Sequence, residues 1–412
     1  MLERLFNRAP PSLFAVGSSV VAQAALLISG VGTAWLLGDV GRGTLAYGAV
    51  IGTLCGTLAS GGLSSSSAVA VSACEDDQDR FGLVAYLRRV SLIRGLVGSC
   101  LGVAVLWFFR SQIESAWIPI AVGTAAASVG LVRLQLAIGI WQGTGRVNVA
   151  NAYRLVPSVV YAVGVILVAV LAELSTIGRL GFVAGAWAIG WILASVVLNE
   201  PSLKVPREVA AIPSDGRREF LKLERSHFFS SLSTYEVLRF DQLAAAVLIT
   251  TAELGVYSVS MSFTGLLKAM ATSFGAASLG DSLLNKSGAS LFRPLANRVL
   301  IVAATAAALF VAIPFAVDIV FPKDFAGAVS PSRLLVLAAA FAAIRRSVVE
   351  MAKGLGLARI GSATEVLQVL FFVVIALLLG RDAEGIAMAT SIALGISCVL
   401  TALWVWIESR AT

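Results

Sequence analysis

Five cationic side chains lie inside apolar runs that are long enough to span a membrane. They are Arg133, Arg239, Lys268, Arg345 and Arg346. A charge at the centre of a membrane helix costs about 2.5–3.5 kcal/mol on insertion scales, so such residues usually face a bundle interior or a water-filled cavity. The planar guanidinium of arginine stays charged and can bind a phosphate or carboxylate through two hydrogen bonds. These five positions are therefore predicted to contact an anionic ligand.

Purely structural roles for these cations remain open. Glu350 lies four residues after Arg346, a spacing at which two side chains meet on one face of a helix. Glu236 precedes Arg239 by three residues, and Lys268 can extend its charge toward a headgroup layer. In each case the charge would be compensated without any ligand.

Acidic and hydroxyl side chains form a second group of candidates. Asp241 is the one acid near the start of the seventh apolar span, and we predict that it couples transport to an ion by binding a proton or Na⁺; Glu350 is a second candidate for this role. A salt bridge from Asp241 to one of the arginines is the alternative. Ser64 and Ser66 belong to a run of small polar residues that either contacts a ligand or lets two helices pack closely.

The overall composition is that of an α-helical protein that crosses a membrane many times. The 412 residues are 58% hydrophobic and 13% charged, with a mean hydropathy of +0.88, whereas soluble domains contain about 25% charged residues. One histidine and four scattered cysteines give no Cys/His metal site. We find no nucleotide-binding glycine-rich loop, so no cofactor and no catalytic residue is predicted. The net charge of +7 is attributed to cytoplasmic loops and not to nucleic-acid binding.

Twelve spans account for the apolar runs. Their predicted cores are 13–37, 44–71, 83–109, 117–141, 150–172, 180–198, 228–250, 256–279, 296–320, 332–352, 363–380 and 386–407. If the spans alternate in direction, 20 of the 31 Lys and Arg residues lie on the side of the N-terminus, 6 lie on the other side and 5 lie within spans. Because positive residues favour the cytoplasmic side, both termini are predicted to be cytoplasmic.

The chain divides into two halves with the same number of spans. A polar, proline-containing segment at 199–226 is predicted to be a cytoplasmic linker between an N-terminal half, 1–198, and a C-terminal half, 227–412. A shift of 211–212 residues aligns Arg133 with Arg345 and the Gly-x-Gly turn at Gly143 with the turn at Gly354. Because each half has an even number of spans, six, both halves have the same orientation in the membrane. We therefore expect two six-helix bundles related by a parallel repeat around a central cavity.

Several short motifs resemble one family in their order and spacing. They are Leu37–Gly43 after the first span, Arg239-Phe240-Asp241-Gln242 in the seventh, Glu253–Tyr257 before the eighth, the two Gly-x-Gly turns, and Gly385–Thr390 at the start of the last. With these motifs, nearly the whole chain resembles the polysaccharide transporters of the multidrug/oligosaccharidyl-lipid/polysaccharide exporter superfamily, which include the O-antigen and capsule flippases.

This resemblance implies a flippase of the plasma membrane and not an enzyme. Its expected substrate is a polyprenyl-diphosphate-linked oligosaccharide, a precursor of surface or exopolysaccharide, moved from the inner to the outer leaflet by alternating access. Membrane lipids and the polymerase and glycosyltransferases of the same pathway are the expected partners, and an ion gradient the expected energy source. The alternatives are a multidrug or cation exporter, which would favour acidic cavity residues, and a membrane enzyme or scaffold of glycan assembly.

Overall fold

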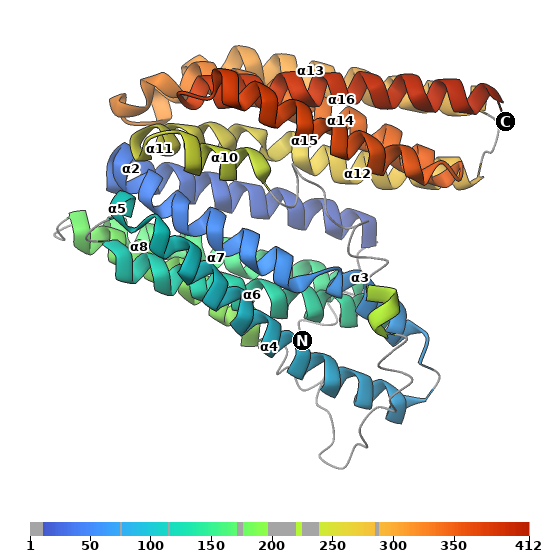
Figure 1. Cartoon of the computed structure of the whole chain (residues 1–412), viewed down its shortest axis with the longest axis horizontal. Helices are drawn as coiled ribbons and strands as arrows, with labels where there is room; N and C mark the ends of the chain where they lie inside the picture. Colours follow the sequence, from blue (N-terminus) through green and yellow to red (C-terminus); the bar gives the residue numbers. More distant parts are fainter. Residues whose placement is uncertain are drawn as a thin grey trace. The chain divides into compact units, whose positions relative to one another are not determined.

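The structure is a computed structural model that describes residues 11–74, 76–113, 116–170, 176–196, 220–224, 239–284 and 288–411. Within these ranges the secondary structure is helical, without a β-strand. The chain forms two compact units. Unit 1 comprises residues 1–37 and 44–233, and unit 2 comprises 38–43 and 234–412. Each unit is a helical bundle (Figure 1).

Unit 1 is built from α2 to α8. These helices are α2 (Pro11–Ser60), α3 (Leu63–Ser72), α4 (Asp77–Phe108), α5 (Arg110–Ile113), α6 (Trp117–Gly143), α7 (Val147–Val170) and α8 (Thr176–Val196). A 50-residue helix would be about 75 Å long, far more than the roughly 30 Å of a bilayer core. Gly38 interrupts α2 with φ 67° and ψ −171°, so α2 contains the first predicted span and the start of the second, which α3 completes.

Unit 2 follows the same plan. It contains α10 (Phe240–Leu248), α11 (Thr251–Ser260), η4 (Met261–Thr264), α12 (Gly265–Leu284), α13 (Gly288–Val320), η5 (Lys323–Ala328), α14 (Val329–Gly354), α15 (Ala358–Leu379) and α16 (Ala383–Ala411). Nine described segments are long and apolar enough to cross a membrane, and the α2–α3 segment holds two of the predicted spans. The predicted all-α, multi-pass fold is confirmed.

One central helix organises each unit. In unit 1, α6 packs against α3, α4, α7 and α8; in unit 2, α14 packs against α12, α13, α15 and α16. Both helices end in the same turn. Gly145 and Gly356 have φ of 77° and 82°, and the next amides, of Arg146 and Leu357, donate to carbonyls five residues earlier at 2.7 and 2.8 Å. The predicted repeat is therefore visible in the backbone.

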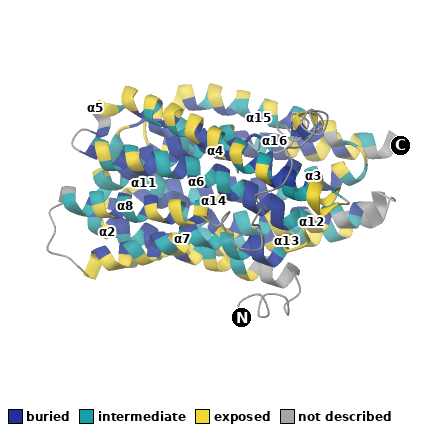
Figure 2. Ribbon diagram, turned by 90° about the horizontal axis from the view of Figure 1, so that it is seen from below, coloured by how far each residue is buried: buried dark blue, intermediate teal, exposed yellow. Residues whose placement is uncertain are grey.

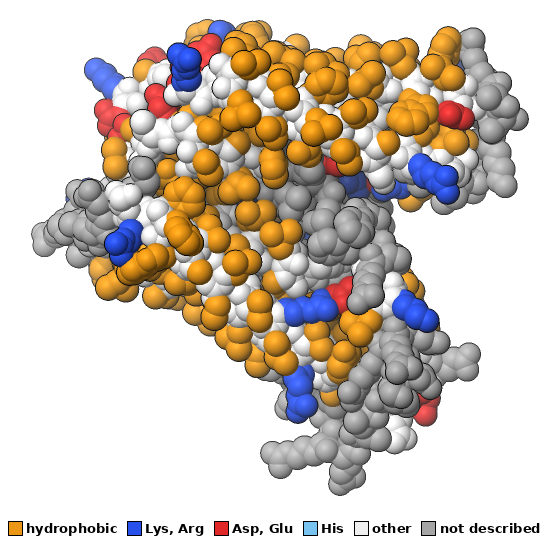
Figure 3. All heavy atoms as spheres, viewed as in Figure 1, with side chains coloured by type: hydrophobic (Ala, Val, Ile, Leu, Met, Phe, Trp, Pro, Cys, Tyr) orange, Lys and Arg blue, Asp and Glu red, His pale blue; other side chains and the backbone are white. Residues whose placement is uncertain are grey.

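Small residues bring the helices of unit 1 close together. Thr124 and Ser128 of α6 donate through their hydroxyls to the carbonyls of Gly48 and Gly52 of α2, at 3.2 and 3.0 Å. Such contacts are typical of membrane helices, where close approach replaces the hydrophobic effect as the source of stability. Within each unit the buried residues lie at helix–helix contacts and the exposed ones on the outer flanks (Figure 2). Hydrophobic side chains cover most of the visible flanks, with charged ones at several helix ends and at a few places between them (Figure 3).

The predicted linker lies mostly outside the described residues. Its described part, 220–224, is helical and belongs to unit 1. Phe220 is buried in a hydrophobic cluster with Trp141, and Glu224 accepts two hydrogen bonds from the Arg94 guanidinium, one of 2.8 Å from Nη2. This part of the linker is thus attached to the N-terminal bundle.

The segment Gly38–Gly43 clusters with unit 2, although the predicted N-terminal half, 1–198, includes it. A Cβ added at Gly43 would overlap the carbonyl of Thr251, and one added at Gly255 would overlap the carbonyl of Asp39. Asp39 and Gly43 each precede their counterparts, Thr251 and Gly255, by 212 residues. The two repeat-related segments therefore contact one another reciprocally, and only glycine fits at either position.

Candidate functional site

Asp241 lies in the first turn of α10, inside unit 2. The preceding Arg239 adopts a left-handed conformation (φ 48°) that costs a non-glycine residue energy, and its side chain is exposed. Asp241 itself is only 3% exposed. The hydroxyl of Tyr257, from α11, donates to Asp241 Oδ2 at 2.8 Å. One carboxylate oxygen is thus held by a neighbouring helix.

The other oxygen, Oδ1, accepts no hydrogen bond within the described part of the chain. Asp241 lines a small cavity together with Gln368 of α15 and Thr390 of α16, and its remaining walls are apolar. Gln368 is 5% exposed, and its Oε1 also lacks a donor among the residues described. The Thr390 hydroxyl donates to its own helix at 2.8 Å, which leaves its lone pairs available. Three side-chain oxygens from three helices therefore surround one space.

This space is large enough for a single small species. Its volume is about 20 Å³, above the roughly 10–15 Å³ that one water needs. Two buried oxygens without donors are costly, and a bound cation, or a proton on Asp241, satisfies both. The Lys268 charge also acts on Asp241, so a proton or a single monovalent cation, for which hard oxygen ligands are suitable, is the largest charge that this site would take. No group of three His, Cys, Asp or Glu residues that could bind a metal occurs in the described ranges.

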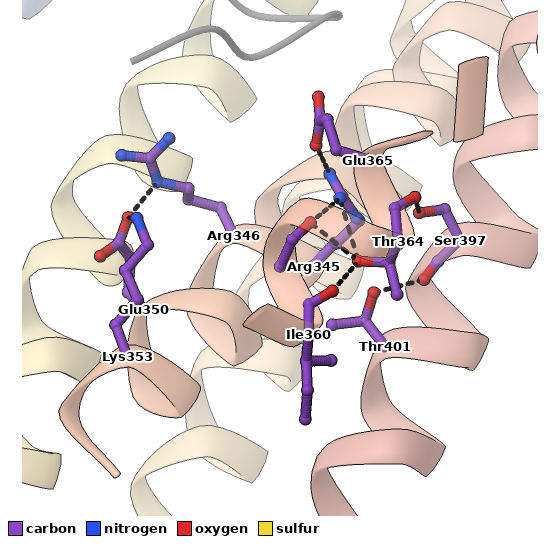
Figure 4. Close-up of polar contacts among 10 residues, drawn as sticks. Arg345, Arg346, Glu350, Lys353, Ile360, Thr364, Glu365, Ser397 and Thr401 are labelled. Atoms are coloured by element: carbon purple, nitrogen blue, oxygen red, sulfur yellow. Dashed lines mark hydrogen bonds and ion pairs between the residues drawn. The ribbon is translucent and has the colours of Figure 1, made fainter. Parts of the chain in front are cut away.

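Arg345 and Arg346 point away from one another (Figure 4). Arg345 Nη1 lies 2.6 Å from Glu365 Oε2 of α15, and its Nη2 donates to the Thr364 hydroxyl at 3.3 Å. Arg345 is 8% exposed. Its charge is therefore compensated inside unit 2, as the structural alternative requires, although the carboxylate belongs to another helix.

Glu350 is held between two cations. Its Oε1 lies 3.0 Å from Arg346 Nε and 2.9 Å from Lys353 Nζ, so the Arg346–Glu350 pair suggested by their spacing is confirmed. Glu350 is 6% exposed. A carboxylate with two cationic partners needs no added ion, which favours a structural role over the predicted ion coupling.

Arg133, in unit 1, has no acidic partner within the described ranges. Its Nε donates to the Ser195 carbonyl at 3.1 Å, at the end of α8, where a cation is favourable. Its two terminal nitrogens make no hydrogen bond to a described residue. Arg88 of α4 lies close enough for the two positive charges to act on one another. Among the described residues, therefore, nothing occupies the terminal nitrogens of Arg133.

The repeat exposes a charge difference between the units. Arg154 of α7 corresponds to Glu365 under the 211-residue shift that relates Gly145 to Gly356. Unit 2 therefore pairs its central arginine with an acid, whereas unit 1 has a second arginine at that place. The exposed Arg154 contacts the Asn151 side chain at 3.3 Å and no carboxylate among the residues described. In the described ranges, unit 1 thus has positive charge at the place where unit 2 has an ion pair.

The remaining candidates lie apart from these groups. Ser66 is fully buried and donates to the carbonyls of its own helix, and the Ser64 carbonyl packs against Gly139 of α6. These contacts fit close helix packing, the second reading of the serine run. Lys268 of α12 is half-buried, and its charge acts on Asp241. The roles assigned to these residues as ligand contacts stay predictions.

Sequence reasoning missed Gln368, Thr390 and Arg154. Gln368 is a lone amide within an otherwise apolar run, which is a usable signal because unpaired polar groups are rare there. The charge count places Arg154 among the 20 cations on the side of the N-terminus, but it lies in the third turn of α7. Its counterpart, Glu365, would have identified the position had the two halves been aligned residue by residue.

Known structures share this fold. An inward-facing multidrug resistance MATE family transporter of the MOP superfamily matches with a TM-score of 0.71 and 16% identity, over 97% of this chain and 98% of the other. The lipid II flippase MurJ, in an inward closed conformation, matches with a TM-score of 0.73 and 14% identity, over 96% of this chain and 88% of the other. The chain has the fold of MOP-superfamily transporters.

A third structure shows that this fold accommodates more than one kind of pocket. It is a MOP-superfamily transporter from Pyrococcus furiosus, described as having a binding pocket of reverse polarity that suggests a different function. It matches with a TM-score of 0.59 and 16% identity, over 98% of this chain and 97% of the other. No protein-family model and no curated protein matches the chain.

Proposed function

We propose that this protein moves a lipid-linked, anionic oligosaccharide from the inner to the outer leaflet of the plasma membrane by alternating access. The substrate is a polyprenyl-diphosphate-linked precursor of a surface polysaccharide, such as an O-antigen, capsule or exopolysaccharide. Support comes from the transporter fold, which it shares with a lipid II flippase. The protein acts as a transporter and not as an enzyme, with both termini in the cytoplasm.

The observation that carries the substrate class is the charge of unit 1. Arg133 and Arg154 face no described carboxylate, whereas the related position in unit 2 forms the Arg345–Glu365 pair. An uncompensated arginine that is partly buried in a membrane bundle, as Arg133 is, is costly unless a ligand supplies the negative charge. A diphosphate does so and matches the guanidinium geometry. These residues would hold the head group while the lipid tail remains in the bilayer.

The cavity at Asp241 supplies the energy coupling in this proposal. A monovalent cation or a proton bound between Asp241, Gln368 and Thr390 would join three helices of unit 2 and so favour one conformation of the bundle. Ligands shift a conformational equilibrium by their difference in affinity for its states. Movement of the ion down its gradient would then drive transport, and enzymes that build or polymerise the glycan would be the partners.

A cation or multidrug exporter is the second candidate. The likeness to MATE transporters and the buried Asp241 favour it. Against it, an exporter of cations would have to tolerate Arg133 and Arg154 in unit 1, which would repel its substrate. The two functions therefore predict opposite effects of removing these arginines.

Rescue of surface glycan in a deletion strain tests the proposal. Wild type, Arg133→Ala, Arg154→Ala and the control Arg89→Ala, an exposed arginine on α4, are compared at matched membrane levels measured by blot. We expect the first two variants to lose export and accumulate lipid-linked glycan inside, while Arg89→Ala exports normally. Full export by both variants would refute the substrate assignment, and gained resistance to cationic drugs would favour the exporter.

A further inference from the structure

An apolar groove lies in unit 1 along the seam between α7 and α8. Its volume is about 550 Å³, and every described residue that lines it is glycine, alanine or a larger apolar residue. Leu167, Phe182 and Ile189, which form its rim, are each more than half exposed. Both helices are long and apolar enough to cross a membrane, so the groove lies at the depth of the lipid hydrocarbon.

Glycines bring the two helices together in one part of the seam and leave room in another. A Cβ added at Gly190 would lie 2.9 Å from a carbonyl oxygen of α7, and one added at Gly164 would overlap the Ala186 side chain. In contrast, a Cβ added at Gly181 or Gly185 would meet nothing within 4 Å. Small residues usually serve the close approach of membrane helices, but these two open a recess beside the contact.

The two arginines that the proposed function assigns to the head group belong to the same helix pair. Arg154 is on α7, ten residues before Gly164, and Arg133 Nε donates to the carbonyl of Ser195, six residues after Ile189 of α8. At about 1.5 Å per residue, the groove begins roughly 9–15 Å from these groups along the helices. It ends about 25 Å away, in the first turn of α8.

The position of the groove favours a long chain. With both termini in the cytoplasm, α7 begins and α8 ends at the cytoplasmic side, where Arg154 and Ser195 lie. The hydrocarbon core is about 30 Å thick, so each leaflet contributes about 15 Å. The tail of an inner-leaflet phospholipid would therefore end near the start of the groove, whereas a polyprenyl chain is long enough to continue along it.

We propose that the α7–α8 groove binds the polyprenyl chain of the lipid-linked substrate, while Arg133 and Arg154 hold its diphosphate. This inference rests on the proposed function and adds a second contact for the same molecule. Within a membrane, binding is driven by packing and not by the release of water. The recesses at Gly181 and Gly185 give the methyl branches of the chain surfaces to pack against.

Polyprenyl diphosphates of different length test the groove. Adducts of the purified full-length chain with undecaprenyl diphosphate and with geranyl diphosphate are counted by native mass spectrometry. Gly181→Leu and Gly185→Leu place a side chain in the groove. Both should fold, because their Cβ has open space and leucine is a better helix former than glycine. Ala307→Leu, at an exposed alanine on α13 of unit 2, is the control.

We expect each groove variant to bind undecaprenyl diphosphate about tenfold more weakly, since its new side chain displaces about ten atom–atom contacts of the polyprenyl chain. Geranyl diphosphate is too short to reach the groove. It should therefore bind equally to wild type, to both groove variants and to Ala307→Leu.

Unchanged binding of undecaprenyl diphosphate in both groove variants, or an equal loss for geranyl diphosphate, would overturn the proposal. An equal loss of dioleoyl phosphatidylglycerol adducts would assign the groove to a phospholipid instead, and wild-type dimers that the groove variants abolish would assign it to a second copy of this chain. If wild type binds both diphosphates and the groove variants do not distinguish them, the groove assignment alone fails. If wild type binds neither diphosphate, the proposed function fails with it.

Discussion

Replacing Asp241 by asparagine separates ion binding from folding. The two side chains have nearly the same shape, so the contact with the Tyr257 hydroxyl at 2.8 Å can be kept. The new amide faces the same cavity as Gln368 Oε1, which has no donor among the described residues. The variant should therefore fold at least as well as wild type in the absence of Na⁺, but it lacks the carboxylate that Asp241 contributes to the described lining of the cavity.

The expected loss of affinity follows from electrostatics. A carboxylate and a monovalent cation about 2.5 Å apart attract one another by roughly 7 kcal/mol at an effective dielectric constant of 20. Desolvation of the two buried charges offsets several kcal/mol of this. A net contribution of about 3 kcal/mol remains, which corresponds to a loss of affinity of roughly 100-fold.

Thermal unfolding of the purified chain measures this effect. Na⁺ is exchanged for choline at constant ionic strength, and Asp318→Asn, which changes an exposed carboxylate on α13, serves as control. At a Na⁺ concentration 100-fold above the dissociation constant, the free energy of unfolding of wild type should rise by about 2.7 kcal/mol. This corresponds to a rise in unfolding temperature of roughly 5–10 °C for a unit of this size. Asp241→Asn should lose most of this gain. If it keeps the full shift, or if wild type shows none, the assignment of a Na⁺ site at Asp241 is wrong.

Three further predictions concern other parts of the molecule. Glu365→Gln should destabilise unit 2 by about 3 kcal/mol, because it leaves the buried Arg345 without its carboxylate; chemical unfolding checks this, and a change below about 0.5 kcal/mol would contradict the buried pair. Gly255→Ala should lower the free energy of unfolding by about 1–3 kcal/mol or more, since the new Cβ would overlap the Asp39 carbonyl. Gly327→Ala, where a Cβ has open space, serves as control. Equal unfolding temperatures of the two variants would refute the close contact. Burial raises the pKa of the Cys74 thiol, Arg80 opposes this rise and Asp79 adds to it. Arg80→Gln should therefore raise that pKa further and slow the alkylation of Cys74 near pH 8 in a Cys100→Ala background, and an unchanged rate would place Arg80 away from the thiol.

The helices were predictable because the membrane restricts what a span can be. A run such as 117–141 has to satisfy its backbone internally and cross about 30 Å of hydrocarbon, and the observed helix is Trp117–Gly143. The predicted spans end at 37 and begin again at 44, which leaves a loop between them. In the structure, one glycine with positive φ, Gly38, is enough to turn the chain, so the residues on both sides of it are helical.

The candidate site was predictable only in part, because its members meet through tertiary structure. Asp241 could be identified as a costly charge in an apolar run, whereas Gln368 and Thr390 are more than 100 residues away and become significant only as neighbours of the same cavity. Arg345 was assigned to a ligand because its partner, Glu365, lies on the next helix and not one turn away. Local spacing did identify Arg346 and Glu350, since that pair lies within one helix.

The reciprocal contact between the segments around Gly43 and Gly255 has a consequence for synthesis. Residues 38–43 belong to unit 2 but are made 212 residues before their counterparts. At about 5–20 residues per second, this delay is roughly 10–40 s. During that interval the N-terminal bundle is complete in sequence, yet its glycine-lined turn has nothing to pack against. The second bundle, in turn, can finish only by recruiting a segment that has already left the ribosome, so the order of translation is built into the assembly of the fold.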